Sequence, residues 1–358
     1  MNDIHTQPGT TPASLRQIGA IRQRLHGLGA SPSHMHRVLR LWSQALPQDS
    51  GGRAIETFLP ARLRAALPVL EGELGAIARV RSVHPAADGA ERLLVELSDG
   101  QTVESVLLPR DGLCISSQVG CAVGCVFCMT GQDGLQRQVG SAEMVAQVAL
   151  ARQRRPVKKV VFMGMGEPAH NLDNVLEAID LLGTAGNIGH KNLVLSTVGD
   201  ARVFEQLPAS KVKPALAISL HSTDAARRAA LLPRAPHIAP EELVAAADDY
   251  ARATGYPIQY QWTLIEGVND TEAEVDGLVR LLTGRYGVLN LIPFNKIDGL
   301  DFRRPPAEAS AAMAHRLHQL GILTKLRRSA AQDVDGGCGQ LRARSGQRRK
   351  IVPIRAAA

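Results

Sequence analysis

The chain has 358 residues, a formal net charge of +7, 45% hydrophobic residues and 21% charged residues. This length allows one large α/β domain with a smaller accessory domain, and the composition is that of an ordinary globular protein. No apolar run approaches the roughly 20 residues that span a bilayer, so composition excludes membrane, collagen-like and mostly disordered chains. The start of the chain lacks the basic and apolar regions of a secretory signal, and we expect a cytoplasmic protein.

The first part of the chain is predicted to be helical. Ser14 has the position of a helix cap, followed three residues later by the glutamine of a capping box. Ser31-Pro32 opens a second helix, because proline suits the first turn of a helix and not its interior. A third helical stretch covers about residues 60–70. These elements predict a helical N-terminal accessory domain over residues 1–75.

Short strand-like runs follow the helical stretch. Asp99-Gly100 separates the last two of them and is a typical hairpin turn. The pattern predicts a β extension over residues 76–111, with strands at residues 76–83, 91–98 and 102–108.

From about residue 112 strands and helices alternate regularly. Six consecutive βα units predict a parallel sheet with right-handed crossovers. Six units are too few for a closed eight-fold barrel, so we expect an α/β fold with a partial (βα)6 barrel over residues 112–329. Residues 330–358 would form a C-terminal segment. The predicted strands cover residues 113–116, 158–163, 192–197, 215–220, 257–265 and 287–293, and the predicted helices cover 141–154, 172–184, 201–207, 240–253, 271–284 and 306–320.

Several of these helices have recognisable start signals. Ser141 precedes the first helix of the barrel, and Pro305-Pro306 precedes the last. Thr271 and Glu274 have the spacing of a capping box. In barrels of this type the chemistry lies at the C-terminal ends of the strands.

Three cysteines form the most informative motif. Cys121, Cys125 and Cys128 have CxxxCxxC spacing in the loop after the first barrel strand. Three thiolates on one loop can hold three irons of a [4Fe–4S] cluster, whereas a fully protein-ligated cluster needs four cysteines. The open fourth iron can bind the amino and carboxylate groups of S-adenosylmethionine and transfer an electron to its sulfonium, which gives a 5′-deoxyadenosyl radical. The alternative is a zinc site with Cys114 as fourth ligand, but structural zinc sites usually pair ligands from separate loops.

The segments around this motif resemble one enzyme family. The sequence is similar to the radical S-adenosylmethionine adenosine RNA methyltransferases, which include bacterial enzymes that methylate carbon 2 of adenosine in 23S ribosomal RNA and some transfer RNAs, and antibiotic-resistance relatives that methylate carbon 8. The resemblance covers about residues 90–345 in the same motif order and is weak before them. Its segments are CISSQVGCAVGCVFC (114–128), FMGMGEP (162–168), LSTVG (195–199), AISLH (217–221), LIPFN (291–295) and DVDGGCGQL (333–341).

The resemblance implies roles for three residues outside the cluster motif. Cys338 would take a methyl group from one S-adenosylmethionine, and the radical from a second would remove hydrogen from that methyl group. A carbon radical can add to the electron-poor carbon 2 of adenine, where polar methyl transfer fails. Cys114 would release the RNA by forming a disulfide with Cys338. Glu104 matches the proton acceptor of the family.

The resemblance also implies the ligands of both cofactors. Cys121, Cys125 and Cys128 would bind the single [4Fe–4S] cluster. S-adenosylmethionine would contact residues at the strand ends, namely Gly166, Glu167, Ser196, Ser219, Leu220, His221 and Asn295. For His221 the alternative is a hydrogen bond that only stabilises the barrel mouth.

The charge distribution points to an anionic partner. Residues 342–358 carry six basic residues and no acidic ones, which accounts for +6 of the net +7. Only 12 residues are aromatic, which leaves little surface for base stacking. We therefore expect ribosomal or transfer RNA as the partner, held mainly through its phosphates. The other expected partner is a low-potential electron donor, and a monomer is the simplest expectation for the oligomeric state.

Three rival functions stay open. The first is the same reaction at carbon 8 or on another RNA. The second is a radical activase that generates a protein-based radical, which would have the cluster but no use for Cys338. The third is a zinc-stabilised RNA-binding module, which iron analysis would separate from a cluster enzyme.

Overall fold

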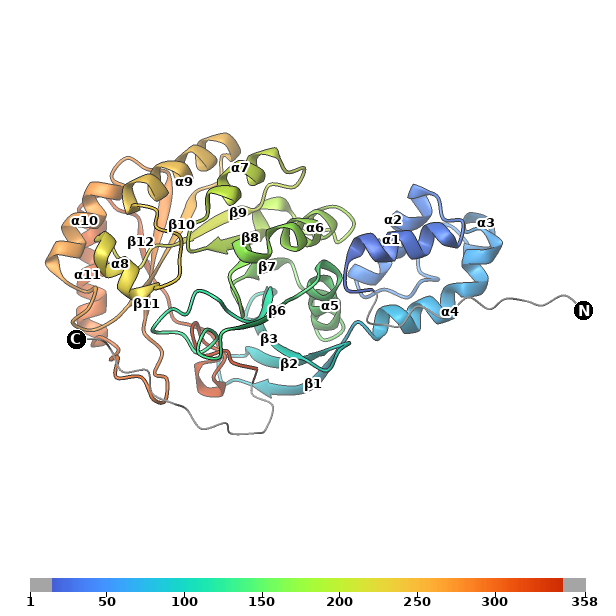
Figure 1. Ribbon diagram of the computed structural model, residues 1–358, viewed down its shortest axis with the longest axis horizontal. Helices are drawn as coiled ribbons and strands as arrows, with labels where there is room; N and C mark the ends of the chain where they lie inside the picture. Colours follow the sequence, from blue (N-terminus) through green and yellow to red (C-terminus); the bar gives the residue numbers. More distant parts are fainter. Residues whose placement is uncertain (1–14, 344–358) are drawn as a thin grey trace, which may run out of the picture.

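The computed structural model describes residues 15–343 and has the predicted α/β fold (Figure 1). Its main sheet has ten strands in the order β1-β2-β3-β4-β7-β8-β9-β10-β11-β12. Ser14 and residues 344–358, which make up most of the basic tail, lie outside the described residues.

The parallel part of the sheet follows the predicted βα alternation. Seven strands from β4 to β12 are parallel to one another, and β12 is a short edge strand that the sequence did not predict. Their bounds are β4 (Gly112–Cys114), β7 (Lys159–Phe162), β8 (Leu193–Thr197), β9 (Ala215–Ser219), β10 (Ile258–Leu264), β11 (Gly287–Pro293) and β12 (Thr324–Leu326). The connecting helices are α5 (Ser141–Arg152), α6 (Leu172–Gly183), α7 (Ala201–Ala209), α8 (Ala225–Leu231), α9 (Pro240–Thr254), α10 (Glu272–Leu282) and α11 (Ala307–Gln319).

Strand β10 shows how the sequence pattern places the two faces of the sheet. Ile258, Tyr260, Trp262 and Leu264 are buried, and they alternate with partly buried polar residues. Successive side chains of a strand point to opposite faces, so the apolar set packs under the helices while the polar set lies on the inner face. The inner face is therefore built to contact polar ligands at its strand ends.

The β extension is an antiparallel continuation of the same sheet. It comprises β1 (Ala78–Pro85), β2 (Glu91–Leu97) and β3 (Thr102–Leu108), and β3 pairs with β4. Gly100 has a φ of 82°, which confirms the predicted turn between β2 and β3. Four helices form the N-terminal domain beside the barrel (Figure 1): α1 (Ile18–Gly27), α2 (Pro32–Ser43), α3 (Ile55–Phe58) and α4 (Ala61–Gly75).

Helices α5 and α10 begin where the sequence predicts, but long-range contacts replace the expected side-chain caps. Helix α1 begins at Ile18, and its backbone N–H donates to Ser141 Oγ at 2.9 Å across 123 residues. Ser141 is thus the first residue of α5, whose cap is Gly140. The predicted capping box of α10 is also absent, since the buried Glu274 carboxylate accepts hydrogen bonds from Ser222 and Thr223 instead. Ser31 does cap α2 as predicted.

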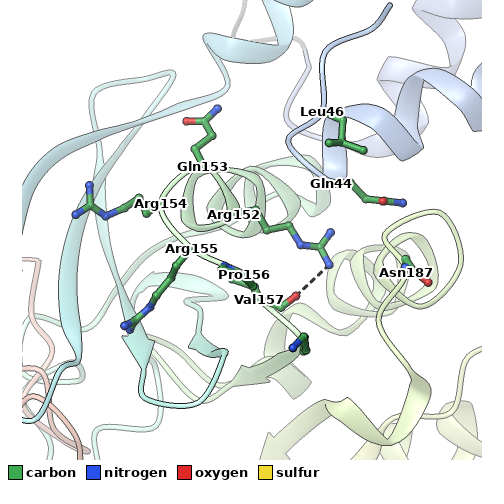
Figure 2. Close-up of a pocket in the computed structure, with 10 residues that line it drawn as sticks. Gln44, Leu46, Arg152, Gln153, Arg154, Arg155, Pro156, Val157 and Asn187 are labelled. Atoms are coloured by element: carbon green, nitrogen blue, oxygen red, sulfur yellow. Dashed lines mark hydrogen bonds between the residues drawn. The ribbon is translucent and has the colours of Figure 1, made fainter. Parts of the chain in front are cut away.

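A groove of about 350 Å³ marks the seam between the N-terminal domain and the barrel (Figure 2). Arg152, at the end of α5, extends toward the N-terminal domain and donates to Ser43 O at 2.8 Å and to Val157 O at 3.2 Å. From the other side, Gln44 Nε2 donates to Ala185 O at 2.8 Å. These bonds between distant segments hold the helical domain against the barrel.

Among residues 15–343, no helix has the length and apolar character needed to cross a membrane.

Candidate active site

A small hairpin holds the cysteine loop above the barrel. Strands β5 (Gln118–Gly120) and β6 (Leu135–Gln138) pair on either side of the loop, and Cys121 N donates to Gly134 O at 3.1 Å. Gly120 has a φ of 77°, and a Cβ there would lie 2.0 Å from Gly134 O. No other residue fits this turn, which fixes where the cysteine loop begins.

The three cysteines of the motif lie together in this loop. Burial, and after it the charges of neighbouring cysteines, raises the pKa values of the Cys121 and Cys125 thiols. The pKa of Cys121 rises to about 12. Burial also raises the pKa of Cys128. Within the described part of the chain, no three His, Cys, Asp or Glu side chains converge on a single-ion site. A cluster does not require such convergence, because each thiolate binds a different iron.

The structure brings the predicted cofactor-binding residues to one edge of the sheet. Each lies at or just after the C-terminal end of a parallel strand: Gly166 and Glu167 after β7, Ser196 in β8, Ser219 at the end of β9, Leu220 and His221 after it, and Asn295 after β11. Gly166 has a φ of 103°, and a Cβ there would lie 2.5 Å from Gln118 Cβ. The strand order therefore gathers, around the cysteine loop, residues that are up to 129 positions apart.

Glu167 is a buried carboxylate with two backbone donors. Its Oε1 accepts from Ala169 N and its Oε2 from Val198 N, both at 3.1 Å. Burial nevertheless raises the pKa of Glu167 to about 7, against the lowering effect of hydrogen bonds from Thr197 and from these two backbone groups. A cationic or amino ligand that hydrogen-bonds to this carboxylate would relieve the cost of keeping it charged.

His221 follows β9 and has a backbone φ of 61°. Its Nδ1 accepts from Thr263 N at 3.0 Å, so the ring proton is on Nε2, which can donate to a ligand. Burial, followed by the charge of Arg228, lowers the pKa of His221 to about 3. Phe127 of the cysteine loop packs edge-on against this ring at 4.9 Å between centroids. The neutral imidazole, which follows β9, thus packs against the cysteine loop through Phe127.

The C-terminal segment carries Cys338 into the same site. Asn295 Nδ2 donates to Cys338 O at 2.9 Å. Met129, the residue after Cys128, donates its backbone N–H to Gly339 O at 2.7 Å. Asn295 is 3% exposed, and its Oδ1 is buried without a partner in the described residues. Cys338 itself is exposed to solvent. The protein around its thiol nevertheless removes part of the hydration of the charged form, which raises the pKa.

Cys114 and Cys338 lie close enough to influence each other. Cys114 ends β4 on the inner face of the sheet, and burial followed by the neighbouring Cys338 raises the pKa of its thiol to about 12. All five cysteines are free thiols, so the disulfide implied by the family resemblance is not formed in this structure. The two residues are 224 positions apart in the chain, and the fold brings them near enough for Cys338 to act on the Cys114 thiol.

Glu104 lies in an anchoring network. It is buried in β3, forms an ion pair with Arg92, and accepts from Arg342 N at 2.8 Å. Arg92 Nε in turn donates to Val334 O at 2.5 Å. In this structure Glu104 and Arg92 tie the C-terminal segment to the β extension.

Arg228 is a site residue that the sequence analysis missed. It is 4% exposed and donates to Val198 O, to Ser219 O at 3.3 Å and to Leu220 O at 3.2 Å. No carboxylate forms an ion pair with it in the described residues, and burial lowers its pKa, while Cys125 and Glu167 oppose that shift. In the sequence Arg228 is one of two adjacent arginines in the short helix α8. Nothing in that local pattern indicates that its side chain contacts the strand ends.

Replacing Arg228 by methionine is expected to destabilise the protein by roughly 2–4 kcal/mol, because three strand-end carbonyls lose their donor inside the protein. The free energy of unfolding from urea titration measures this. Arg280→Met is the matched control, since Arg280 forms an exposed ion pair and its loss should cost about 0.5 kcal/mol or less. Equal stabilities of the two variants would show that Arg228 does not support the strand ends.

The site residues fit the two cofactors. Three thiols share one loop next to a buried carboxylate, a ring N–H and the unpartnered acceptor Asn295 Oδ1. An amino acid ligand with its own donors and acceptors can satisfy these groups, whereas an apolar ligand would leave them unpaired.

Comparisons with known proteins agree with this geometry. Residues 115–279 match the Radical SAM superfamily, whose members use a [4Fe–4S] cluster and S-adenosylmethionine. A probable RNA methyltransferase of Methylibium petroleiphilum is 70% identical over 329 residues, covering 92% of this chain and 93% of that protein. A second, from Azoarcus sp., is 69% identical over 328 residues, covering 92% and 94%.

A solved structure shows the same architecture over nearly the whole chain. The radical SAM methyltransferase from Sphaerobacter thermophilus is 33% identical and superimposes with a TM-score of 0.79, covering 92% of this chain and 98% of that one. These matches extend through the cysteine loop and the strand-end residues. The chain therefore belongs to the radical SAM superfamily and, within it, to one family with the proteins named probable RNA methyltransferases.

Proposed function

We propose that this S-adenosylmethionine-dependent methyltransferase methylates carbon 2 of an adenosine in ribosomal or transfer RNA, using Cys338 as a methyl carrier. The observation that supports this best is the position of Cys338. The C-terminal segment brings it against the cysteine loop and opposite Cys114. A radical activase, the rival within the superfamily, has no use for such a cysteine pair. RNA as substrate rests on the names of the relatives, and the cytoplasm is the matching location.

In this proposal each part of the site has one task. Cys121, Cys125 and Cys128 hold the cluster, and the strand-end residues hold S-adenosylmethionine. When bound, these cofactors supply the radical that removes hydrogen from the methyl group on Cys338. The resulting carbon-centred radical would add to the adenine ring. The adduct would return one electron to the cofactor centre, and the ring hydrogen would leave as a proton, which Glu104 takes. Arg92 keeps the Glu104 carboxylate oriented through their ion pair.

Release of the RNA falls to Cys114. Its sulfur would bond to the sulfur of Cys338 while the bond between that sulfur and the transferred carbon breaks. The electron pair of the broken bond stays with the carbon, which takes up a proton and becomes the methyl group on the adenine. A thiol reductant would then reduce the disulfide between Cys114 and Cys338 before the next cycle. Since burial raises the pKa of Cys114 to about 12, the residue is a thiol at neutral pH and must lose its proton as it attacks. A low-potential donor supplies electrons to the cluster.

Mass spectrometry of nucleosides from RNA of strains with and without this gene tests the proposal. We expect 2-methyladenosine to disappear when the gene is deleted and to return with the wild-type gene. Loss of 8-methyladenosine instead would support the carbon 8 reaction. Unchanged nucleosides in both ribosomal and transfer RNA would reject an adenosine methyltransferase, and bound zinc in place of iron in anaerobically purified protein would favour the RNA-binding module.

Binding of S-adenosylmethionine is expected to weaken as the pH falls through about 7. The raised pKa of Glu167 means that its neutral form is favoured below that pH, and a neutral carboxyl group holds an amino group less well. The loss approaches about tenfold per pH unit, the limit for one linked proton. Calorimetric titration between pH 6 and pH 8 measures it. Glu167→Gln should bind weakly without this component, so identical pH profiles of the two proteins would contradict the assignment.

A further inference from the structure

Three basic side chains share the inner face of the sheet. Lys159 is the first residue of β7, Lys325 lies in β12, and Arg327 follows that strand. All three are exposed, and none belongs to the set that binds the cluster or S-adenosylmethionine.

The strand register shows that Lys325 faces inward. Ala217 lies on the inner face, where it packs with Val161 and Val194. Ser219 is two residues further along β9 and shares this face, since side chains alternate along a strand. Ser219 pairs with Gln261, which pairs with Asn290, and Asn290 pairs with Lys325. Paired residues in neighbouring strands share a face, so Lys325 points inward.

Lys159 faces inward for the same reason. It lies two residues before Val161 in β7, so both side chains are on one face. In the strand order, β8 to β11 separate β7 from β12. The charges of Arg327 and Lys325 nevertheless act on Lys159 and, after burial, lower its pKa. The curved sheet therefore brings the three cations together across its interior.

This arrangement is electrostatically unfavourable without an anion. Like charges held together repel one another, and among residues 15–343 no carboxylate forms an ion pair with any of the three. Asn290 lies beside them, since its Oδ1 accepts from Arg327 Nη1 at 3.3 Å. Asn290 is 1% exposed, and its Nδ2 is buried with no hydrogen-bond partner in the described residues. An unpartnered amide donor beside three cations suits an anionic ligand with several acceptor oxygens.

The cluster of cations lies next to the methyl carrier. The charge of Arg327 acts on Cys338, where it opposes the rise that burial causes in the pKa of the thiol. Asn295 Nδ2 donates both to Ser329 Oγ at 2.8 Å, two residues after Arg327, and to Cys338 O at 2.9 Å. An anion bound to Arg327 would thus lie near the segment that carries Cys338.

We propose that Lys159, Lys325, Arg327 and Asn290 form a phosphate-binding site for the RNA strand that enters the barrel, holding a backbone phosphate beside the adenosine presented to Cys338. This inference rests on the proposed function, because it takes RNA as the ligand. The site would position the substrate through its backbone, while the residues at the strand ends select the base.

Salt-dependent binding of a short RNA stem-loop with one unpaired adenosine tests this site. We expect Lys159→Gln, Lys325→Gln and Arg327→Gln each to reduce the slope of log affinity against log salt by about 0.7–0.9, the value for one lost phosphate contact. The exposed Lys211 is the matched control, and Lys211→Gln should leave the slope unchanged. Each of the three variants should melt at the same temperature as the wild type or higher, since it relieves repulsion. A merely structural role would instead lower the melting temperature.

Other outcomes separate this site from the reaction. Unchanged slopes in all three variants would overturn the site, even if the wild type methylates RNA. Reduced slopes in a protein that methylates no RNA would support the site and reject the proposed reaction. Competition by inorganic phosphate or adenosine 5′-monophosphate as strong as that by the stem-loop would show a site for free phosphate, and would overturn RNA as its ligand.

Discussion

Replacing Cys121, Cys125 or Cys128 by alanine is expected to abolish the iron–sulfur cluster and the reductive cleavage of S-adenosylmethionine. Each change removes one of only three protein ligands, and the described residues offer no further cysteine on that loop. The loop itself should keep its shape, because the hairpin bond from Cys121 N to Gly134 O uses the backbone. Loss of the cluster should therefore not unfold the barrel.

Iron and sulfide analysis of anaerobically reconstituted protein, together with its visible absorbance, measures this effect. Cys338→Ala is the matched control, since it removes a cysteine close to the loop that is not assigned as a ligand. We expect full iron content in the control and little in the three loop variants. Full cluster content in any loop variant would mean that another residue binds the iron, and the ligand assignment would be wrong.

Cys338→Ala and Cys114→Ala are expected to fail at different steps. Cys338→Ala should keep the cluster and still cleave S-adenosylmethionine, yet transfer no methyl group to RNA. Cys114→Ala should form the bond between Cys338 and RNA but be unable to break it. The basis for the difference is that Cys338 lies on the segment bonded to Asn295 and the cysteine loop, whereas Cys114 lies at the end of β4, near enough for Cys338 to raise the pKa of its thiol.

Denaturing gels and mass spectrometry of the protein after reaction with RNA distinguish these variants. A covalent protein–RNA species should accumulate with Cys114→Ala and be absent from the double variant that also lacks Cys338. Normal turnover by Cys114→Ala would remove its role in release. An adduct in the double variant would show that RNA attaches elsewhere, which would reject Cys338 as the methyl carrier.

The sequence alone predicted the order of elements and the loop that is proposed to hold the cluster. Hydrophobic alternation and turn residues act over a few positions, so most strands and helices of the barrel were predicted to within a few residues, whereas the short helix α8 was not predicted. The CxxxCxxC spacing is equally local. Because the C-terminal ends of parallel strands share one edge, the positions of residues such as Glu167 and Asn295 also followed from the βα pattern.

The tertiary structure decided every feature that depends on residues far apart in the chain. Ser141 caps α1 across 123 residues, and Glu274 binds the loop after β9 instead of its own helix. A side chain gains about the same hydrogen bond from a distant backbone group as from the first turn of its own helix. The sequence near Ser141 or Glu274 therefore does not show which of the two partners is used. The short edge strand β12, which the sequence analysis missed, needs pairing with β11 to exist as a strand.

The same reason explains which site residues were missed. Arg228 and Lys325 look like ordinary charged residues in sequence, and only the curvature of the sheet puts one beneath the strand ends and the other opposite β7. The disulfide implied by the resemblance is not formed in this structure. Spacing along the chain thus predicted which loop would hold the cluster, whereas closure of the sheet decided which charges surround it.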